Sequence, residues 1–367
     1  MSRGGGGEEA ARGQAEERAA RIEAPEDIEA INRLYRERRW SDGLPVVPPT
    51  VERVERMLAH TRRARHEIIA RIAPGFGAAT VERIAINAVL AGCDPECLDV
   101  LIAAVDAVAA PEFNLQGIQA TTNPVAVWMV VNGPVAARLG VNGAFNCLGP
   151  GPWANAAIGR ALRLLLQNVG GAHAGEMDRA THGQPGKYTF CCAENEAANP
   201  WEPLHVERGY RREAGTVTVV GAEGTMNMNT HTKDASELLR AIAETMQHPP
   251  SNEYCHGGEP WLILSPEHAE ILKAAGLTKA QVKRRLWELS KMPARRMTDK
   301  DLLRVEASRK KELGEIGPDT LLPVSSRPED IWIVVAGGPG THSVYVPSYG
   351  TTRAVTREIV QDARRPQ

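Results

Sequence analysis

The chain lacks the charge excess and the long apolar runs that mark nucleic-acid-binding and membrane proteins. Its 43 lysine and arginine residues nearly balance its 45 aspartate and glutamate residues, so no net field favours nucleic acid or an anionic membrane. No apolar run approaches the roughly 18 residues of a membrane span, and the N-terminus is rich in glycine, glutamate and arginine, unlike a signal peptide. We therefore expect a soluble, cytoplasmic protein that binds neither nucleic acid nor membrane.

Cysteine is also scarce. Six cysteines in 367 residues do not make a secreted disulfide framework, and in a reducing compartment they are buried thiols, ligands or nucleophiles.

Complete sequence signatures of known catalytic or nucleotide-binding sites are missing as well. Gly149 and Gly151 lack the later glycine of a dinucleotide fingerprint, Lys187 lacks the glycine of a phosphate loop, and no Gly-x-Ser-x-Gly elbow supports a serine hydrolase.

Three apolar segments have the length and composition of buried strands. They cover residues 124–131, 217–220 and 331–335, and each runs into a glycine-containing turn. We predict an α/β fold with a mixed or mostly parallel sheet flanked by helices and glycine-rich turns at the strand ends. The carboxyl ends of the three strands are expected to share a ligand-facing edge, although the glycines could also serve the turns alone.

The rest of the chain divides simply. Residues 1–22 have almost nothing apolar to bury and predict a disordered arm. Residues 23–367 predict a single large α/β domain, with 266–315 as a candidate helical subdomain, and we expect a homo-oligomer. No internal repeat of fixed period is visible in the sequence.

Glycines and prolines precede a predicted helix that begins near Trp153. Such a helix start leaves backbone N–H groups free, which is a common origin of anion sites, although a purely structural turn fits equally well. Arg160, two turns along, could reach the anion or pair with an acid. The predicted substrate-binding residues in and around this segment are Asn132, Asn142, Asn146, Gly149, Gly151, Asn155, Arg160, Lys187, Arg208 and His342.

Carboxylates and histidines follow in the next segment. If residues 188–196 form a strand, Glu194 and Glu196 lie on one face, where they could act as a coupled acid and base or bind a metal. With His205 and His231 they would form the mixed nitrogen and oxygen ligand set of a divalent zinc or iron centre. The alternative is that the histidines are hydrogen-bonded loop residues and the glutamates pair with neighbouring arginines.

The alternative to a metal site is nucleophilic catalysis by a cysteine thiolate. Cys147, close to the glycine-rich helix start, is the best-placed nucleophile, with Cys191 and Cys192 next, and His182 or His205 could serve as the base. Cys191 and Cys192 cannot both face one site in a regular strand. The alternative for each cysteine is a small buried core residue.

Several short motifs resemble a group of bacterial proteins that accompany, or are fused to, small (seleno)proteins named for a selenocysteine, glycine, serine, cysteine motif. The resemblance rests on residues 132–134, 193–196, 200–201, 205–209, 335–338 and 342–343 and extends from about 40 to 359. It implies a companion thiol or selenol protein and names no activity. The chain itself lacks that redox motif.

Two functions follow from these patterns. The first is an enzyme that cleaves or reduces a carbon–heteroatom bond of a small, polar, anionic molecule, as a lyase, hydrolase or reductase. Its acid and base would be Glu194 or Glu196 with His205, assisted by a thiolate from Cys191 or Cys147 or by a bound metal. The second is a non-catalytic partner or metal-handling subunit that presents Met226, Met228 and His231, with Cys191, to the companion protein.

Overall fold

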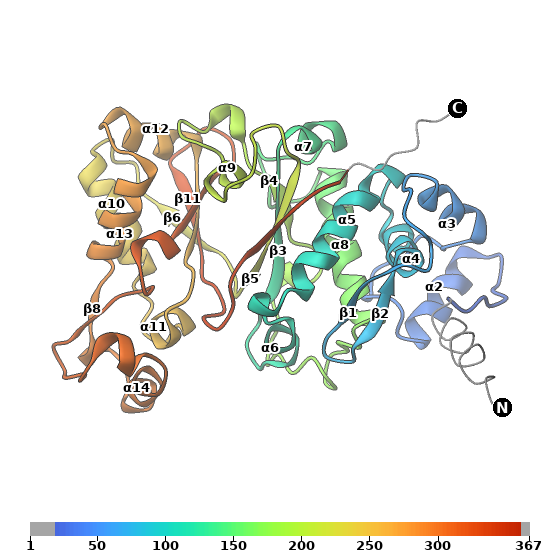
Figure 1. Cartoon of the computed structure of the whole chain (residues 1–367), viewed down its shortest axis with the longest axis horizontal. Coiled ribbons are helices and arrows are strands. Elements are labelled where there is room, and N and C mark those ends of the chain that lie inside the picture. Colours follow the sequence, from blue (N-terminus) through green and yellow to red (C-terminus); the bar gives the residue numbers. More distant parts are fainter. Residues whose placement is uncertain (1–18, 361–367) are drawn as a thin grey trace, which may run out of the picture.

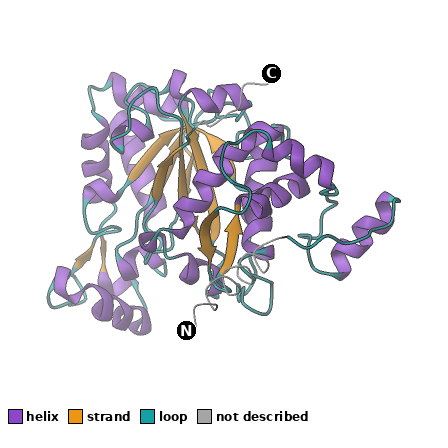
Figure 2. Ribbon diagram, turned by 45° about the vertical axis from the view of Figure 1, so that its right-hand side comes forward, coloured by secondary structure: helices purple, strands orange, loops and turns teal. Residues whose placement is uncertain are grey.

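The computed structural model describes residues 19–360, so all but the last four residues of the predicted arm lie outside the described residues. Two four-stranded sheets pack face to face, and helices cover the outer face of each (Figure 1). Figure 2 shows the same strands surrounded by helices. The chain is therefore an α/β protein with mixed sheets flanked by helices, which confirms the predicted fold class.

Both sheets combine one parallel with two antiparallel pairings. The first sheet has the order β12-β5-β3-β4, with β3 (Ala126–Asn132), β4 (Cys191–Ala193), β5 (Thr216–Ala222) and β12 (Val355–Glu358). The second has the order β10-β7-β11-β6, with β6 (Met226–Asn229), β7 (Trp261–Leu264), β10 (Trp332–Val335) and β11 (His342–Val346). Only β3 with β4, and β7 with β10, are parallel. Two small hairpins pair β1 (Ile68–Ile72) with β2 (Gly77–Thr80), and β8 (Met292–Pro293) with β9 (Leu321–Leu322).

Helices form the two outer layers. The layer on the first sheet contains α3 (Val51–Leu58), α4 (Val81–Ala91), α5 (Leu98–Ala109), α6 (Leu115–Ala120) and α8 (Trp153–Asn168). The layer on the second contains α10 (Ala235–Met246), α11 (Asn252–His256), α12 (Pro266–Ala274), α13 (Lys279–Leu289) and α14 (Asp299–Leu313). The remaining helices are α2 (Ile28–Glu37), α7 (Pro134–Leu139) and α9 (Leu204–Glu207). Helices α12, α13 and α14, in the candidate subdomain, bury side chains in the same core as β7 and β10.

The two sheets are topological copies that exchange their last strands. The series α5, α6, β3, α7, α8, β4, β5, β6 is matched by α10, α11, β7, α12, α13, β10, β11, β12, when α9 is left out of the first series and β8, α14 and β9 are left out of the second. The final strand of each series pairs in the other sheet, β6 with β11 and β12 with β5. A repeat is therefore present in the topology although none is visible as a fixed period in the sequence.

Aromatic side chains fill the space between the sheets. Trp128 of β3 and Trp261 of β7 meet edge to face with ring centroids 5.6 Å apart, and Trp332 stacks on Trp261 at 5.8 Å. Alternate residues of each strand point the other way, into the helical layers. Within residues 19–360, no helix is long and apolar enough to cross a membrane.

The structure corrects three expectations about the strands. The carboxyl ends of β3 and β5 do not share an edge, because the two strands are antiparallel; a strand buried on both faces carries no sign of its direction. The sequence of residues 78–92 predicts a single helix, but residues 78–80 belong to β2, and Thr80 caps α4, its Oγ1 accepting from Arg83 N at 3.2 Å. The strand predicted to continue to Glu196 ends at Ala193, where Asn195 N turns to donate to Val335 O of the second sheet at 2.7 Å.

Candidate functional site

The carboxyl ends of β3, β4 and β10 meet where the two sheets join. Asn132 is the last residue of β3, and its Nδ2 donates to Glu194 Oε2 at 2.6 Å and to Glu196 Oε1 at 3.1 Å. Gly133 N also donates to Glu196 Oε1, at 2.6 Å. Glycine is required at 133 because φ is +81° and a Cβ would lie 2.1 Å from Ala214 O. The two predicted carboxylates therefore converge, although they do not share a strand.

Glu194 is buried and both of its oxygens are occupied. Oε1 accepts from Asn199 Nδ2 at 2.8 Å and from Val335 N at 3.4 Å, while Oε2 accepts from Leu204 N at 2.7 Å as well as from Asn132. Burial raises the pKa of Glu194, and the charge of Lys279 and these hydrogen bonds oppose the rise. The carboxylate thus ties the end of β4 to β10 and α9.

His205 joins this cluster. Its Nε2 donates to Arg212 O at 3.1 Å in the tautomer that this contact requires. Its Nδ1 lies 3.8 Å from Glu196 Oε1 and has no hydrogen-bond partner among the described residues. The imidazole is fully buried, whereas 27% of the Glu196 side chain is exposed. The pair therefore extends from the interior to the surface.

The predicted metal ligands do not form one set. His231 lies at the edge of the second sheet, where its Nδ1 contacts Thr341 Oγ1 and its ring packs against His342 at 6.0 Å. His231 is separated from the other predicted ligands because the chain leaves the first sheet after β5, and β6 pairs with β11 in the second sheet. Across the described chain, no group of three His, Cys, Asp or Glu side chains has the arrangement of a metal site. Met226 is exposed and Met228 is buried, although both lie on the same face of β6.

Cys191 and Cys192 point to opposite faces of β4, as the alternation requires. Cys191 faces the helical layer beside Cys97 and Cys93, and burial raises the pKa of its thiol. Cys192 faces the space between the sheets, where it meets Cys147. Neither glutamate lies beside Cys191, so that cysteine is a core residue and the predicted site loses it.

Cys147 and Cys192 form a hydrogen-bonded thiol pair. The Cys192 thiol donates to Cys147 Sγ, which lowers the pKa of Cys147 and raises that of Cys192. The backbone N–H groups of Cys147, Leu148 and Gly337 lie near Cys147 Sγ and also lower the pKa of this thiol, whereas burial raises it. Two loops thus surround one sulfur with donors that favour the thiolate.

The asparagines predicted to bind substrate hold the Cys147 loop in shape. Asn155 Oδ1 accepts from Asn142 N at 2.7 Å, and its Nδ2 donates to Asn142 O and Cys147 O at 2.9 and 3.0 Å. Asn146 has φ +58°, and its Nδ2 donates to Pro150 O at 2.7 Å. The turn of Gly149 and Gly151 leads into α8, whose N-cap, Pro152, offers no side-chain acceptor. An anion at this helix start stays a prediction.

The other predicted ligand residues have partners within the chain. Arg160 forms a bidentate pair with Asp42 at 2.7 and 2.8 Å, which is the second of the two roles expected for it. Arg208 donates to Ala354 O at 2.7 Å and lies 4.5 Å above the Trp332 ring. His342 Nδ1 contacts Asn227 Oδ1 at 3.3 Å, on the edge of the second sheet. None of the three reaches Cys147.

His182 and Lys187 lie in the loop before β4. This loop is anchored at the opposite end of β3 from Asn132, because Thr181 N donates to Thr122 O and Gln184 Nε2 donates to Pro124 O, each at 2.9 Å. His182 is exposed there and is not positioned as a base for Cys147. Lys187 binds Asp178.

The surface over Cys147 is apolar. Cys147 is 6% exposed, but its neighbours Phe145, Leu148 and Trp153 are 68%, 38% and 64% exposed. The Phe145 ring lies against Gly338, where a Cβ would come within 2.0 Å of a ring carbon. Trp153 Nε1 donates to Gly92 O at 3.1 Å. Three exposed apolar side chains therefore lie close to the buried Cys147 in the sequence.

Sequence reasoning missed two clusters. Glu223 and Glu253 are close enough near the end of β5 for the charge of Glu223 to act on Glu253, and burial raises their pKa values to about 7 and about 8. Arg163 shares Asp178 with Lys187. The only sequence signal was a glutamate directly after an apolar strand, at Glu223, because the partners of each group come from segments far apart in the chain.

Comparison with models of protein families, with curated proteins and with solved structures gives no match to this chain.

Proposed function

We propose that this chain is a dithiol oxidoreductase in which Cys147 is the attacking thiolate and Cys192 the resolving thiol. The hydrogen-bonded pair of Cys147 and Cys192 carries the proposal. A lowered pKa raises the fraction of reactive thiolate at neutral pH, and a second thiol in contact is what a resolving step needs. The proposal keeps the thiolate of the sequence-based hypothesis and replaces the carbon–heteroatom bond with a disulfide.

The reaction moves two electrons from the dithiol to a substrate disulfide. Cys147 Sγ attacks one substrate sulfur, the substrate S–S bond breaks, and a mixed disulfide and one substrate thiolate form. Cys192 gives its proton to that thiolate and attacks Cys147 Sγ. The second substrate thiolate leaves and takes a proton from water, and a Cys147–Cys192 disulfide remains until another dithiol reduces it.

The surface favours a disulfide presented by a protein. Three pockets of residues 19–360 are lined by neither Cys147 nor Cys192, and Cys147 itself is only 6% exposed. The exposed Phe145, Leu148 and Trp153 offer apolar contact instead. A companion thiol or selenol protein, which the sequence resemblance implies, has the chemistry of such a substrate.

A second candidate is the acid–base reaction on a small anionic molecule. One observation favours it: His205 Nδ1 has no hydrogen-bond partner within residues 19–360 and lies 3.8 Å from the partly exposed Glu196. The two could pass a proton between the interior and a substrate at the surface.

Substitution of Glu196 by Gln separates the candidates. The dithiol reaction does not use this carboxylate, so we expect Glu196→Gln to reduce oxidised glutathione or a protein disulfide within about twofold of the wild-type rate. Glu194→Gln is the matched control for packing, because it disturbs a saturated buried carboxylate; we expect it to lower the free energy of unfolding by about 1–3 kcal/mol. A folded Glu196→Gln protein that lost turnover by a hundredfold would support the acid–base candidate instead.

A further inference from the structure

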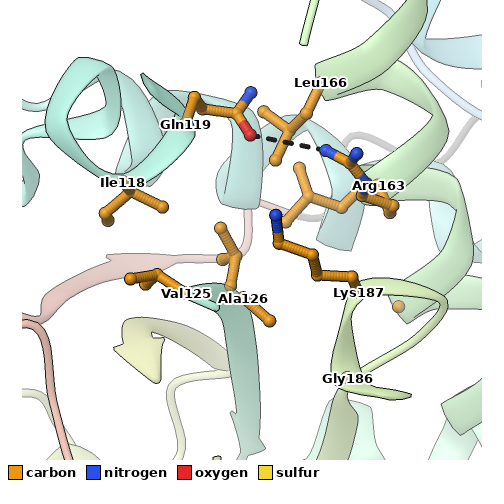
Figure 3. Close-up of a pocket in the computed structure, with 11 residues that line it drawn as sticks. Ile118, Gln119, Val125, Ala126, Arg163, Leu166, Gly186 and Lys187 are labelled. Carbon is orange, nitrogen blue, oxygen red and sulfur yellow. Dashed lines mark hydrogen bonds between the residues drawn. The ribbon is translucent and has the colours of Figure 1, made fainter. Parts of the chain in front are cut away.

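A small cavity lies between α6, the start of β3, α8 and the turn Pro185–Lys187 (Figure 3). Its volume is about 20 Å³, the space of one or two water-sized groups. Part of its wall is apolar and consists of Ile118, Val125, Ala126, Val127, Leu162 and Leu166. No cysteine is among its lining residues, so it is separate from the dithiol.

Three polar side chains from different elements face this cavity. Figure 3 shows Lys187, Arg163 and Gln119 directed toward the same space. Lys187 Nζ donates to both oxygens of Asp178, at 2.8 and 2.7 Å. The contacts of Arg163 are longer, 3.2 Å to Asp178 Oδ2 and 3.4 Å to Gln119 Oε1. One carboxylate therefore serves two cations.

The charges around the cavity do not balance. The side chains of Arg163, Lys187 and Asp178 are only 15%, 16% and 6% exposed. Asp42 is also close enough to act on Arg163, but it forms a bidentate pair with Arg160. Burial lowers the pKa of both Arg163 and Lys187, and Asp178 opposes this. One positive charge is left over in a shielded place, where a bound anion would offset its cost.

We propose that the cavity binds one small monovalent anion, a halide or a carboxylate of formate size, between Lys187, Arg163 and Gln119. The two cations supply charge-assisted hydrogen bonds. The Gln119 amide can turn its Nε2 toward the anion, because among the residues that the structure describes this group makes only a long hydrogen bond, of 3.5 Å, to Ala73 O. Sulfate and phosphate exceed the volume. Arg163 also donates to Ala172 O at 3.3 Å, so the anion would strengthen the link between α8 and the loop that follows it.

Thermal unfolding of the full chain tests the site, with chloride or formate replacing sulfate at constant ionic strength. We expect the melting temperature of the wild type to rise with anion concentration and to saturate, since a ligand of the native state stabilises it. A rise with chloride identifies a halide site, and a rise with formate alone a carboxylate site. Lys187→Met leaves one cation for Asp178 and should abolish the rise. Lys233→Met, which removes an exposed lysine paired with Glu267, should leave it intact.

Asp178→Asn removes a negative charge from the site, whereas Lys187→Met removes a positive one. It therefore tests the anion site even if Lys187→Met fails to fold. Removing the competing carboxylate leaves two unneutralised cations, so half-saturation should shift to an anion concentration lower by about tenfold. The proposal is overturned if the melting temperature of the wild type does not depend on either anion, or if Asp178→Asn leaves half-saturation unchanged.

Discussion

Cys147→Ser is expected to slow the reduction of a disulfide substrate by at least about a thousandfold, because a serine hydroxyl does not provide a thiolate near neutral pH. Cys192→Ser should behave differently. Its Cys147 can still attack, but nothing resolves the product, so the protein should accumulate as a mixed disulfide with one substrate fragment attached. Stopped-time quenching with acid followed by intact-protein mass spectrometry distinguishes the two variants.

The matched control is the cysteine next to Cys192. Cys191 is equally buried but faces the opposite side of β4, so Cys191→Ala should keep the wild-type rate within about threefold while losing some stability from the small cavity. If Cys191→Ala were as inactive as Cys147→Ser, the assignment of the dithiol to the space between the sheets would be wrong.

The stability of the protein should fall as pH rises from 5 to 8, and Glu253→Gln should remove much of that fall. Glu253 is buried, its Oε1 accepts from Ser348 N at 2.9 Å, and its Oε2 accepts from the Tyr345 hydroxyl. Burial, with the charge of Glu223, raises its pKa to about 8. The unfolded chain has the ordinary glutamate pKa near 4.3 and releases the proton first. The contribution of Glu253 to the free energy of unfolding is therefore fully present below about pH 4. It falls by about 1.4 kcal/mol per pH unit until the pH passes the pKa of Glu253 in the folded protein.

Urea unfolding at pH 5, 6.5 and 8 measures this dependence. Glutamine imitates the protonated carboxyl, so the variant should lose less stability than the wild type between pH 5 and pH 8, by a few kcal/mol. Glu288→Gln, at an exposed position of α13, should leave the slope unchanged. The variant and the wild type would have parallel stability profiles if Glu253 were ionised in the folded protein at pH 6.5.

The elements of the fold were predictable where local chemistry decides them. Thr50 accepts from Arg53 N at 3.3 Å and starts α3, and the apolar runs after 124, 217 and 331 are strands. Strand direction and exchange were not predictable, because a strand buried on both faces has the same composition whether its neighbour is parallel or antiparallel. The pairing of β6 with β11 joins residues more than a hundred positions apart, and no local pattern encodes it.

The candidate site was also predictable only in part. The sequence indicated Cys147 because of the helix start that follows it. The structure gives a different cause, since the groups that lower the pKa of its thiol include Gly337 N, from the turn after β10. Glu194 and Glu196 do converge, but through Asn132, which the sequence linked to neither of them, and His205 lies beside Glu196. Those partners depend on how two sheets meet.

The dithiol is tested most directly by mapping the disulfides of the wild-type chain. The protein is oxidised with a stoichiometric disulfide reagent, digested without reduction and analysed by mass spectrometry, before and after treatment with a dithiol. The account predicts one reversible cross-link, between the peptides that carry Cys147 and Cys192. Both peptides remaining reduced while the reagent is consumed elsewhere, or a link from Cys147 to any other cysteine, would contradict it.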